Sequence, residues 1–236
     1  REFYCALFDW TAGEASAEFG GYFMFLRDGQ PVAGAMPGRP GADVTDQWSV
    51  YLRVDDAHKT LEAALAAGAQ VRQPAIEIAD LGTSAVIEDP AGARIGLWQV
   101  NTFPGFGGVR PQHGAPGWVE LHTRDYDGAI AFYRDVFGWD VHTAADTPQF
   151  RYSTLGAADK AYGGIMDATA FVPPEAPALW SVYFAADDVD ATLDRAGEHG
   201  GAVVMAAEDT PYGRLATASD PTGTQFKLVG PTASRS

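Results

Sequence analysis

Residues 132–139 read FYRDVFGW, and residues 3–10 carry the related sequence FYCALFDW. Two further blocks recur in the same order: WSVY at residues 48–51 returns at 180–183, and an Asp-Pro-x-Gly tetrapeptide at 89–92 returns at 220–223. The three offsets are 129, 132 and 131 residues. Because the blocks keep both their order and their spacing, we interpret the chain as a tandem duplication.

The second copy predicts two units with the element order βαβββ. Residues 118–123 alternate like a strand, and residues 125–137 carry an apolar stripe at helical spacing. Asp125 is placed to cap the start of this helix, and Gly138 to end it. Strands are expected near 139–143, 150–155 and 162–166. The pattern then restarts with a strand at 180–185, a helix at 188–199 and strands near 202–206, 213–218 and 225–229. The Asp-Pro-x-Gly tetrapeptide before the last strand predicts a hairpin turn.

The first copy follows the same plan but is short of one strand. Trp118 precedes Phe132 by 14 residues, and the equivalent position before Phe3 falls outside the sequence. We therefore expect residues 1–8 to end a helix whose strand comes from upstream residues of the native protein or, less simply, from a partner chain. The organisation predicted is a first domain at 1–100, a glycine- and proline-rich linker at 101–117 and a second domain at 118–230.

Composition restricts the functional classes. The chain has 236 residues, of which 46% are hydrophobic and 20% charged, as in ordinary globular proteins. Its net charge of −15 would repel nucleic acid and anionic lipid. No apolar run is long enough for a membrane helix. The single cysteine, Cys5, cannot form an internal disulfide or a cysteine-rich metal site, which favours a cytoplasmic location.

The paired βαβββ units, the Phe-Tyr-x-x-x-Phe-x-Trp pattern that closes the first helix and the Asp-Pro-x-Gly before the last strand resemble the vicinal oxygen chelate superfamily. This superfamily contains glyoxalase I, extradiol dioxygenases, fosfomycin-resistance enzymes and bleomycin-binding proteins. The resemblance runs from Phe3 to Leu228 and is closest to bacterial proteins with two glyoxalase-like domains in one chain, often labelled as hydroxylases. It implies an α+β fold in which tandem βαβββ units form two glyoxalase-like domains. Their curved mixed sheets would carry helices on the convex side and ligands in the concave cup.

The resemblance also implies where a divalent metal would bind. Metal-dependent members place His and Glu on strand positions that face the cup. In the second copy those positions hold Trp118, Ser181 and Lys227, and in the first copy Ser49 and Gly96. Tryptophan is no metal ligand, and a lysine ammonium repels a cation. We therefore expect no metal site and no cofactor. Glu120 with His122 is the remaining two-ligand alternative.

Strand alternation predicts which other side chains face the cup. Glu120 and Lys227 are interpreted either as an acid and a base or as a buried ion pair. Tyr51 and Tyr183, at equivalent places in the two copies, either bind a ligand through their hydroxyls or pack between the facing units. The residues proposed as catalytic are Glu120, His122, Tyr183 and Lys227. Those proposed as ligand-binding are Trp118, Ser181, Gln225, Tyr51, Ser49, Arg53 and Trp98, the tryptophans as stacking walls.

Two functional classes follow. The first is a metal-free small-molecule binder, like the bleomycin-binding branch, that holds an aromatic or largely apolar metabolite or antibiotic. The alternative is an enzyme of the same superfamily: an isomerase, lyase or hydroxylase-type catalyst, or a metal-dependent glyoxalase or dioxygenase. The partner expected in either class is the small molecule, with the chain acting as a monomeric pseudo-dimer or as a homodimer.

Overall fold

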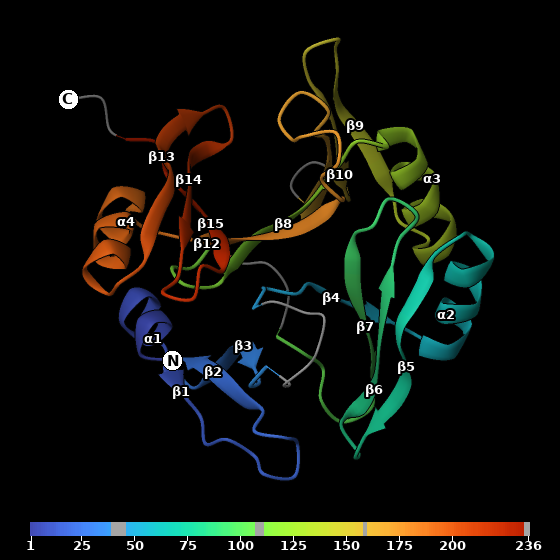
Figure 1. Cartoon of the computed structure of the whole chain (residues 1–236), viewed down its shortest axis with the longest axis horizontal. Helices are drawn as coiled ribbons and strands as arrows, with labels where there is room; N and C mark the ends of the chain where they lie inside the picture. The colour runs from blue at the N-terminus through green and yellow to red at the C-terminus, as the bar shows by residue number, and fades with distance from the viewer. Residues whose placement is uncertain (39–45, 107–110, 158–159, 234–236) are drawn as a thin grey trace. The chain divides into compact units, whose positions relative to one another are not determined.

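The computed structural model of the chain describes residues 1–38, 46–106, 111–157 and 160–233 (Figure 1). It divides into two compact units, and each unit combines residues from both copies of the repeat. Unit 1 comprises Arg1–Trp48, Phe106–Trp118 and Val182–Ser236; unit 2 comprises Ser49–Gly105 and Val119–Ser181. The units thus group the chain differently from 1–100 and 118–230, whose status as two domains stays a prediction. Residues 107–110 of the predicted linker lie outside the described part of the chain.

Unit 1 opens with helix α1 (Glu2–Phe8), as predicted for the end of a helix at residues 1–8. Its small sheet has the order β1-β2-β3, formed by Thr11–Ala12, Phe23–Arg27 and Gln30–Ala35. Helix α4 (Val189–Glu198) packs on the strands β13 (Ala202–Thr210) and β14 (Gly213–Ser219), and β15 (Gln225–Gly230) follows. β15 runs antiparallel to β14 and parallel to β12 (Leu179–Ala185).

Unit 2 contains one βαβββ set from each copy. The first-copy set is β4 (Tyr51–Val54), α2 (Ala57–Ala66), β5 (Gln70–Ile78), β6 (Gly82–Glu88) and β7 (Arg94–Val100), with sheet order β4-β7-β6-β5. The second-copy set is β8 (Pro116–Thr123), α3 (Tyr126–Phe137), β9 (Val141–Asp146), β10 (Arg151–Leu155) and β11 (Gly163–Asp167). Among the strands of the second copy, the order is β8-β11-β10-β9 in unit 2 and β13-β14-β15-β12 in unit 1.

The local signals for helix ends and turns are confirmed. Asp125 accepts a hydrogen bond from the backbone N–H of Gly128 at 3.1 Å and so caps α3. Gly138 ends α3 in the left-handed region at φ 65°. In the first Asp-Pro-x-Gly turn, the N–H of Gly92 donates to the carbonyl of Asp89 at 3.0 Å, the bond that closes a four-residue turn. None of the helices in the described ranges is long and apolar enough to cross a membrane.

The repeated motifs meet in a buried hydrogen-bonded cluster in unit 2. The Tyr133 hydroxyl of α3 donates to the Asp89 carboxylate at 2.9 Å and accepts from the Trp180 indole N–H at 2.8 Å. Tyr133 is fully buried, and burial raises its pKa well above the ordinary value. Burial also raises the pKa of Asp89. The tyrosine and tryptophan belong to the second copy and the aspartate to the first, so this cluster links the copies.

Unit 1 contains the equivalent cluster with the copies exchanged. Tyr4 of α1 donates to the Asp220 carboxylate at 2.9 Å, and the Trp48 indole N–H donates to the Tyr4 hydroxyl at 2.9 Å. Burial raises the pKa of Tyr4. Here the tyrosine and tryptophan come from the first copy and the aspartate from the second. The three sequence blocks that recur along the chain therefore supply the tyrosine, the tryptophan and the aspartate of the same hydrogen-bonded cluster, which occurs once in each unit.

Candidate functional site

A buried carboxylate and an imidazole meet on β8, as the alternation of this strand predicts. His122 Nε2 lies 2.6 Å from Glu120 Oε1. Only 8% of Glu120 is exposed, so the carboxylate is largely removed from water. The intervening residue, Leu121, points to the opposite face and is fully buried in the core. A carboxylate and a histidine at hydrogen-bonding distance can exchange a proton or orient a polar ligand group.

A third member of this group, Tyr152 on β10, was missed by the sequence analysis. Its hydroxyl donates to Glu120 Oε2 at 2.7 Å. β11 lies between β8 and β10, and its residue next to Glu120 in the sheet register is Gly164. A Cβ at this glycine would collide with the Tyr152 hydroxyl. The Tyr152 side chain therefore reaches Glu120 by passing over β11 at Gly164, where no side chain blocks it.

A second pair of predicted residues meets in unit 1. Tyr183 on β12 and Lys227 on β15 are direct neighbours in the parallel register. The Lys227 ammonium donates to the Tyr183 hydroxyl at 3.1 Å and lies 4.9 Å from the centre of its ring. Glu120 belongs to unit 2 and Lys227 to unit 1, so a pairing between these two residues stays a prediction.

The equivalent position in the first copy is filled by an aromatic ring. Tyr51 on β4 is the register neighbour of Gly96 on β7, and any Cβ at Gly96 would collide with the Tyr51 ring. These are the first-copy counterparts of Tyr183 and Lys227. A carboxylate, the metal ligand that the resemblance implies at this strand position, cannot be accommodated beside Tyr51 as it lies here.

The residues present do not fit the divalent metal site that the superfamily implies. The implied positions hold Trp118, Ser181 and Lys227 in the second copy, and the tyrosine-covered glycine in the first. Among the described residues there is no group of three His, Cys, Asp or Glu side chains arranged to hold a metal ion. Glu120 and His122 supply two ligands where protein sites normally supply three or more.

The other predicted ligand-binding residues differ in exposure. Trp98 donates its indole N–H to the carbonyl of Phe103 at 2.9 Å, so its polar edge is satisfied within unit 2. Trp118 and Ser181 are partly buried, whereas three others are exposed: Ser49, Arg53 and Gln225. Exposed polar side chains can contribute to ligand binding only at the rim of a pocket. Their part in a shared binding site stays a prediction.

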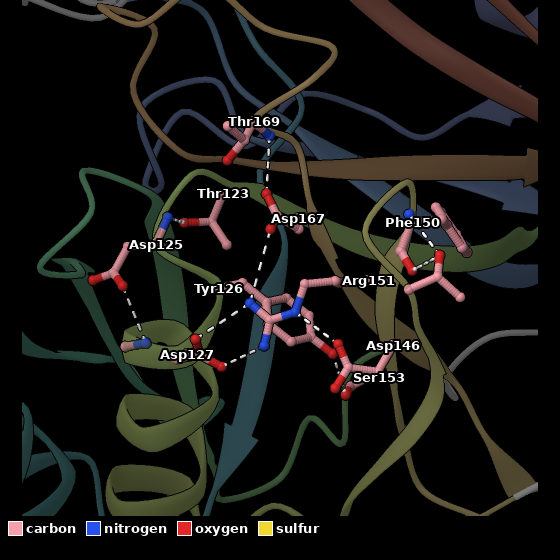
Figure 2. Close-up of polar contacts among 12 residues, drawn as sticks. Thr123, Asp125, Tyr126, Asp127, Asp146, Phe150, Arg151, Ser153, Asp167 and Thr169 are labelled. Atoms are coloured by element: carbon pink, nitrogen blue, oxygen red, sulfur yellow. Dashed lines mark hydrogen bonds and ion pairs between the residues drawn. The ribbon is translucent and has the colours of Figure 1, made fainter.

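An arginine-centred cluster fixes the strand that carries Tyr152 (Figure 2). Arg151 forms two hydrogen bonds to Asp127 at 2.8 and 3.2 Å and one to Asp146 at 2.9 Å, and its guanidinium lies 4.3 Å from the centre of the Tyr126 ring. The hydrogen bond from Arg151 lowers the pKa of Asp127. The cluster joins the start of α3 to the β9–β10 hairpin. Its carboxylates Asp127 and Asp146 are exposed, and we interpret the cluster as structural.

Comparisons with known proteins agree with this fold. The family model "Glyoxalase/Bleomycin resistance protein/Dioxygenase superfamily" matches residues 115–228. "Putative glyoxylase CFP32" of Mycobacterium tuberculosis is 37% identical over 98% of this chain and 89% of the relative. "Anthracycline biosynthesis protein DnrV" of Streptomyces peucetius is 34% identical over 97% of this chain and 86% of the relative.

Solved structures support the same fold. The 2,3-dioxygenase LapB from Pseudomonas sp. KL28 aligns with a TM-score of 0.58 at 15% identity, over 98% of this chain and 87% of that chain. The Mn(II)-bound glyoxalase from Novosphingobium aromaticivorans aligns with a TM-score of 0.60 at 14% identity, over 96% and 77%. At such identities the likeness concerns the fold alone. The family model and the relatives that match over most of their length establish that this chain belongs to the glyoxalase/bleomycin resistance protein/dioxygenase superfamily.

Proposed function

We propose that this chain is a small-molecule-binding member of its superfamily that works without a metal and holds an aromatic or largely apolar metabolite. The observation that carries the proposal is the buried group on β8: Glu120 contacts both His122 and Tyr152, while Trp118 stands where metal-dependent members have a histidine. A few oriented polar groups beside an aromatic wall are typical of small-molecule pockets.

The polar groups of the site and the name of one relative both indicate a class of ligand. A ring system with hydroxyl or carbonyl groups at its edge would stack on a tryptophan and hydrogen-bond to Glu120, His122 or Tyr152. The name of DnrV connects that relative with anthracyclines, which are fused aromatic ring systems of this kind. We therefore extend the proposal to a hydroxylated, fused aromatic ligand.

The test is a titration of tryptophan fluorescence with a hydroxyanthraquinone as the probe. The protein should show saturable quenching, and Glu120→Gln or Tyr152→Phe should weaken binding by roughly tenfold, the effect of one hydrogen bond worth about 1.4 kcal/mol. Tyr126→Phe is the matched control, because it removes a hydroxyl bonded at 2.7 Å to Ser153 on the same strand but not in this group. Equal affinities for all variants would contradict the proposal.

The 2.6 Å contact between Glu120 and His122 favours a second candidate, an enzyme that moves a proton on the bound ligand. In this case His122 would take or return a proton while Glu120 orients its ring. Incubation of the probe with the protein in deuterated water, followed by mass spectrometry, distinguishes the two. A gain of deuterium or a change of mass that His122→Gln abolishes supports catalysis, and an unchanged probe supports binding alone.

The proposal also covers the partners of the chain, its location in the cell and its oligomeric state. The small molecule is the expected partner, and the net charge of −15 disfavours nucleic acid. A cytoplasmic location, and a monomer or homodimer in solution, remain parts of the proposal. Fractionation of the source cells and sedimentation of the purified protein would test them.

A further inference from the structure

The sheet β4-β7-β6-β5 of unit 2 has one face that the proposed function does not use. Helix α2 packs against the other face of this sheet (Figure 1). Ile87 and Ile95, which are 0% and 1% exposed, belong to the core cluster that includes Leu61 of α2. Because side chains alternate along a strand, the residues next to them point away from α2, to the side that we call the open face. The rings of Tyr51 and Trp98 lie on this open face.

Both rings cover a strand glycine and expose an aromatic surface. A Cβ at Gly96 would collide with three ring atoms of Tyr51 at nearly equal distances, so this ring lies flat over the backbone. A Cβ at Gly82 would likewise collide with the Trp98 indole. The Tyr51 hydroxyl is hydrogen-bonded to Ser84, and the Trp98 indole N–H donates to a backbone carbonyl at 2.9 Å. Because their polar atoms have partners and Tyr51 is still 50% exposed, the rings present mainly their aromatic surfaces for stacking.

The open face also carries an excess of positive charge. Arg53 follows Tyr51 by two residues on β4, so both side chains lie on the same face. Glu88 on β6 and Arg94 on β7 are register partners, and the Arg94 Nε donates to the Glu88 carboxylate at 3.1 Å. Arg72 of β5 donates to the same carboxylate at 2.9 Å. Three arginines against one glutamate give this face a local positive charge in a chain whose net charge is −15.

We infer that the open face is a second ligand site, for a planar aromatic molecule that carries a negatively charged group. The aromatic part would stack on Tyr51 and Trp98. The charged group would pair with Arg53, which is the register neighbour of Trp98 and is exposed at the edge of the two rings. This inference goes beyond the proposed function, because the ligand is an anion and because the open face belongs to a different sheet from Glu120.

The probes are naphthalene-2-sulfonate and its neutral counterpart naphthalene-2-methanol, titrated into the whole chain. The readout is the Trp98 indole signal in ¹H–¹⁵N spectra, identified by its loss in Trp98→Phe. The sulfonate should shift this signal saturably and bind more tightly than the alcohol, and added KCl should weaken only the sulfonate. Tyr51→Ala should raise the Kd of the sulfonate roughly two- to tenfold, the effect of one aromatic contact. Arg53→Gln should raise it roughly two- to fivefold, the effect of one exposed charge.

The matched controls remove exposed side chains elsewhere. Tyr212→Ala removes a tyrosine of unit 1 that is 62% exposed, Arg134→Gln removes an exposed arginine of α3, and both should leave the Kd unchanged. Glu120→Gln should also leave it unchanged, so failure here and failure of the proposed function are distinguishable. The inference is overturned if the sulfonate gives no saturable shift, if the alcohol binds as tightly, or if Arg53→Gln binds the sulfonate as the native protein does. If Tyr51→Ala does not fold, Arg53→Gln and the comparison of the two probes decide the question.

Discussion

Replacement of Tyr152 by phenylalanine removes only the hydroxyl that donates a hydrogen bond to Glu120. The hydroxyl donates at 2.7 Å to a carboxylate that is 8% exposed. Hydrogen bonds to charged groups contribute about 1.5–3 kcal/mol, and those between neutral groups about 0.5–1.5 kcal/mol. Tyr126→Phe removes a neutral bond of the same 2.7 Å length, to Ser153, from a side chain that is also buried.

We therefore expect Tyr152→Phe to lower the free energy of unfolding by about 1 kcal/mol more than Tyr126→Phe does. For a chain of this size the extra loss corresponds to a further decrease in Tm of about 2–4 °C. Urea denaturation followed by circular dichroism measures the difference, provided that the m-values of the two variants agree. If Tyr126→Phe is as destabilising as Tyr152→Phe or more so, the hydrogen bond from Tyr152 to Glu120 is no stronger than a bond between neutral groups. Our description of Glu120, His122 and Tyr152 is then wrong.

Three further outcomes follow from the structure. Gly164→Ala should displace the Tyr152 hydroxyl and destabilise unit 2. Gly197→Ala is the control, because a Cβ at this position of α4 meets nothing within 4 Å, and it should be neutral or stabilising by about 0.5–1 kcal/mol. Thermal melts of the two variants measure the difference. Tyr133→Phe should cost at least about 1.5 kcal/mol by urea denaturation, because it leaves a buried indole donor and a carboxylate without this partner. Burial lowers the pKa of His113 below its ordinary value of 6.5, so the stability it contributes is complete above pH 6.5 and is lost as the pH falls toward the folded-state pKa. The stability gap between the native protein and His113→Gln should therefore shrink from pH 7.5 to pH 5.5, and a constant gap would contradict this reasoning.

The elements predicted correctly are those specified by neighbouring residues. Asp125 and Gly138 bound α3 as expected because a cap depends on a few consecutive residues. The contact between Glu120 and His122 was predictable because alternation along one strand places residues two apart on a shared face.

What the sequence did not reveal depends on which strands become neighbours. Tyr152 joins Glu120 only because β11 separates β10 from β8 and carries Gly164 at the crossing point. The adjacent glycines at 163 and 164 within a predicted strand were the available signal, since a strand glycine often marks close approach. Likewise Asp89 was interpreted as a turn residue, and its bond to Tyr133 depends on the pairing of segments from different copies.

The exchange of partners between the copies has a consequence for any cleavage of the chain. Tyr133 lies after the segment that joins the copies and Asp89 before it, while Tyr4 lies before it and Asp220 after it. A protease that cuts this segment would therefore produce two fragments that remain held together by both buried clusters. Expressed as separate polypeptides, the fragments should complement each other, because each provides the tyrosine that the other's aspartate requires.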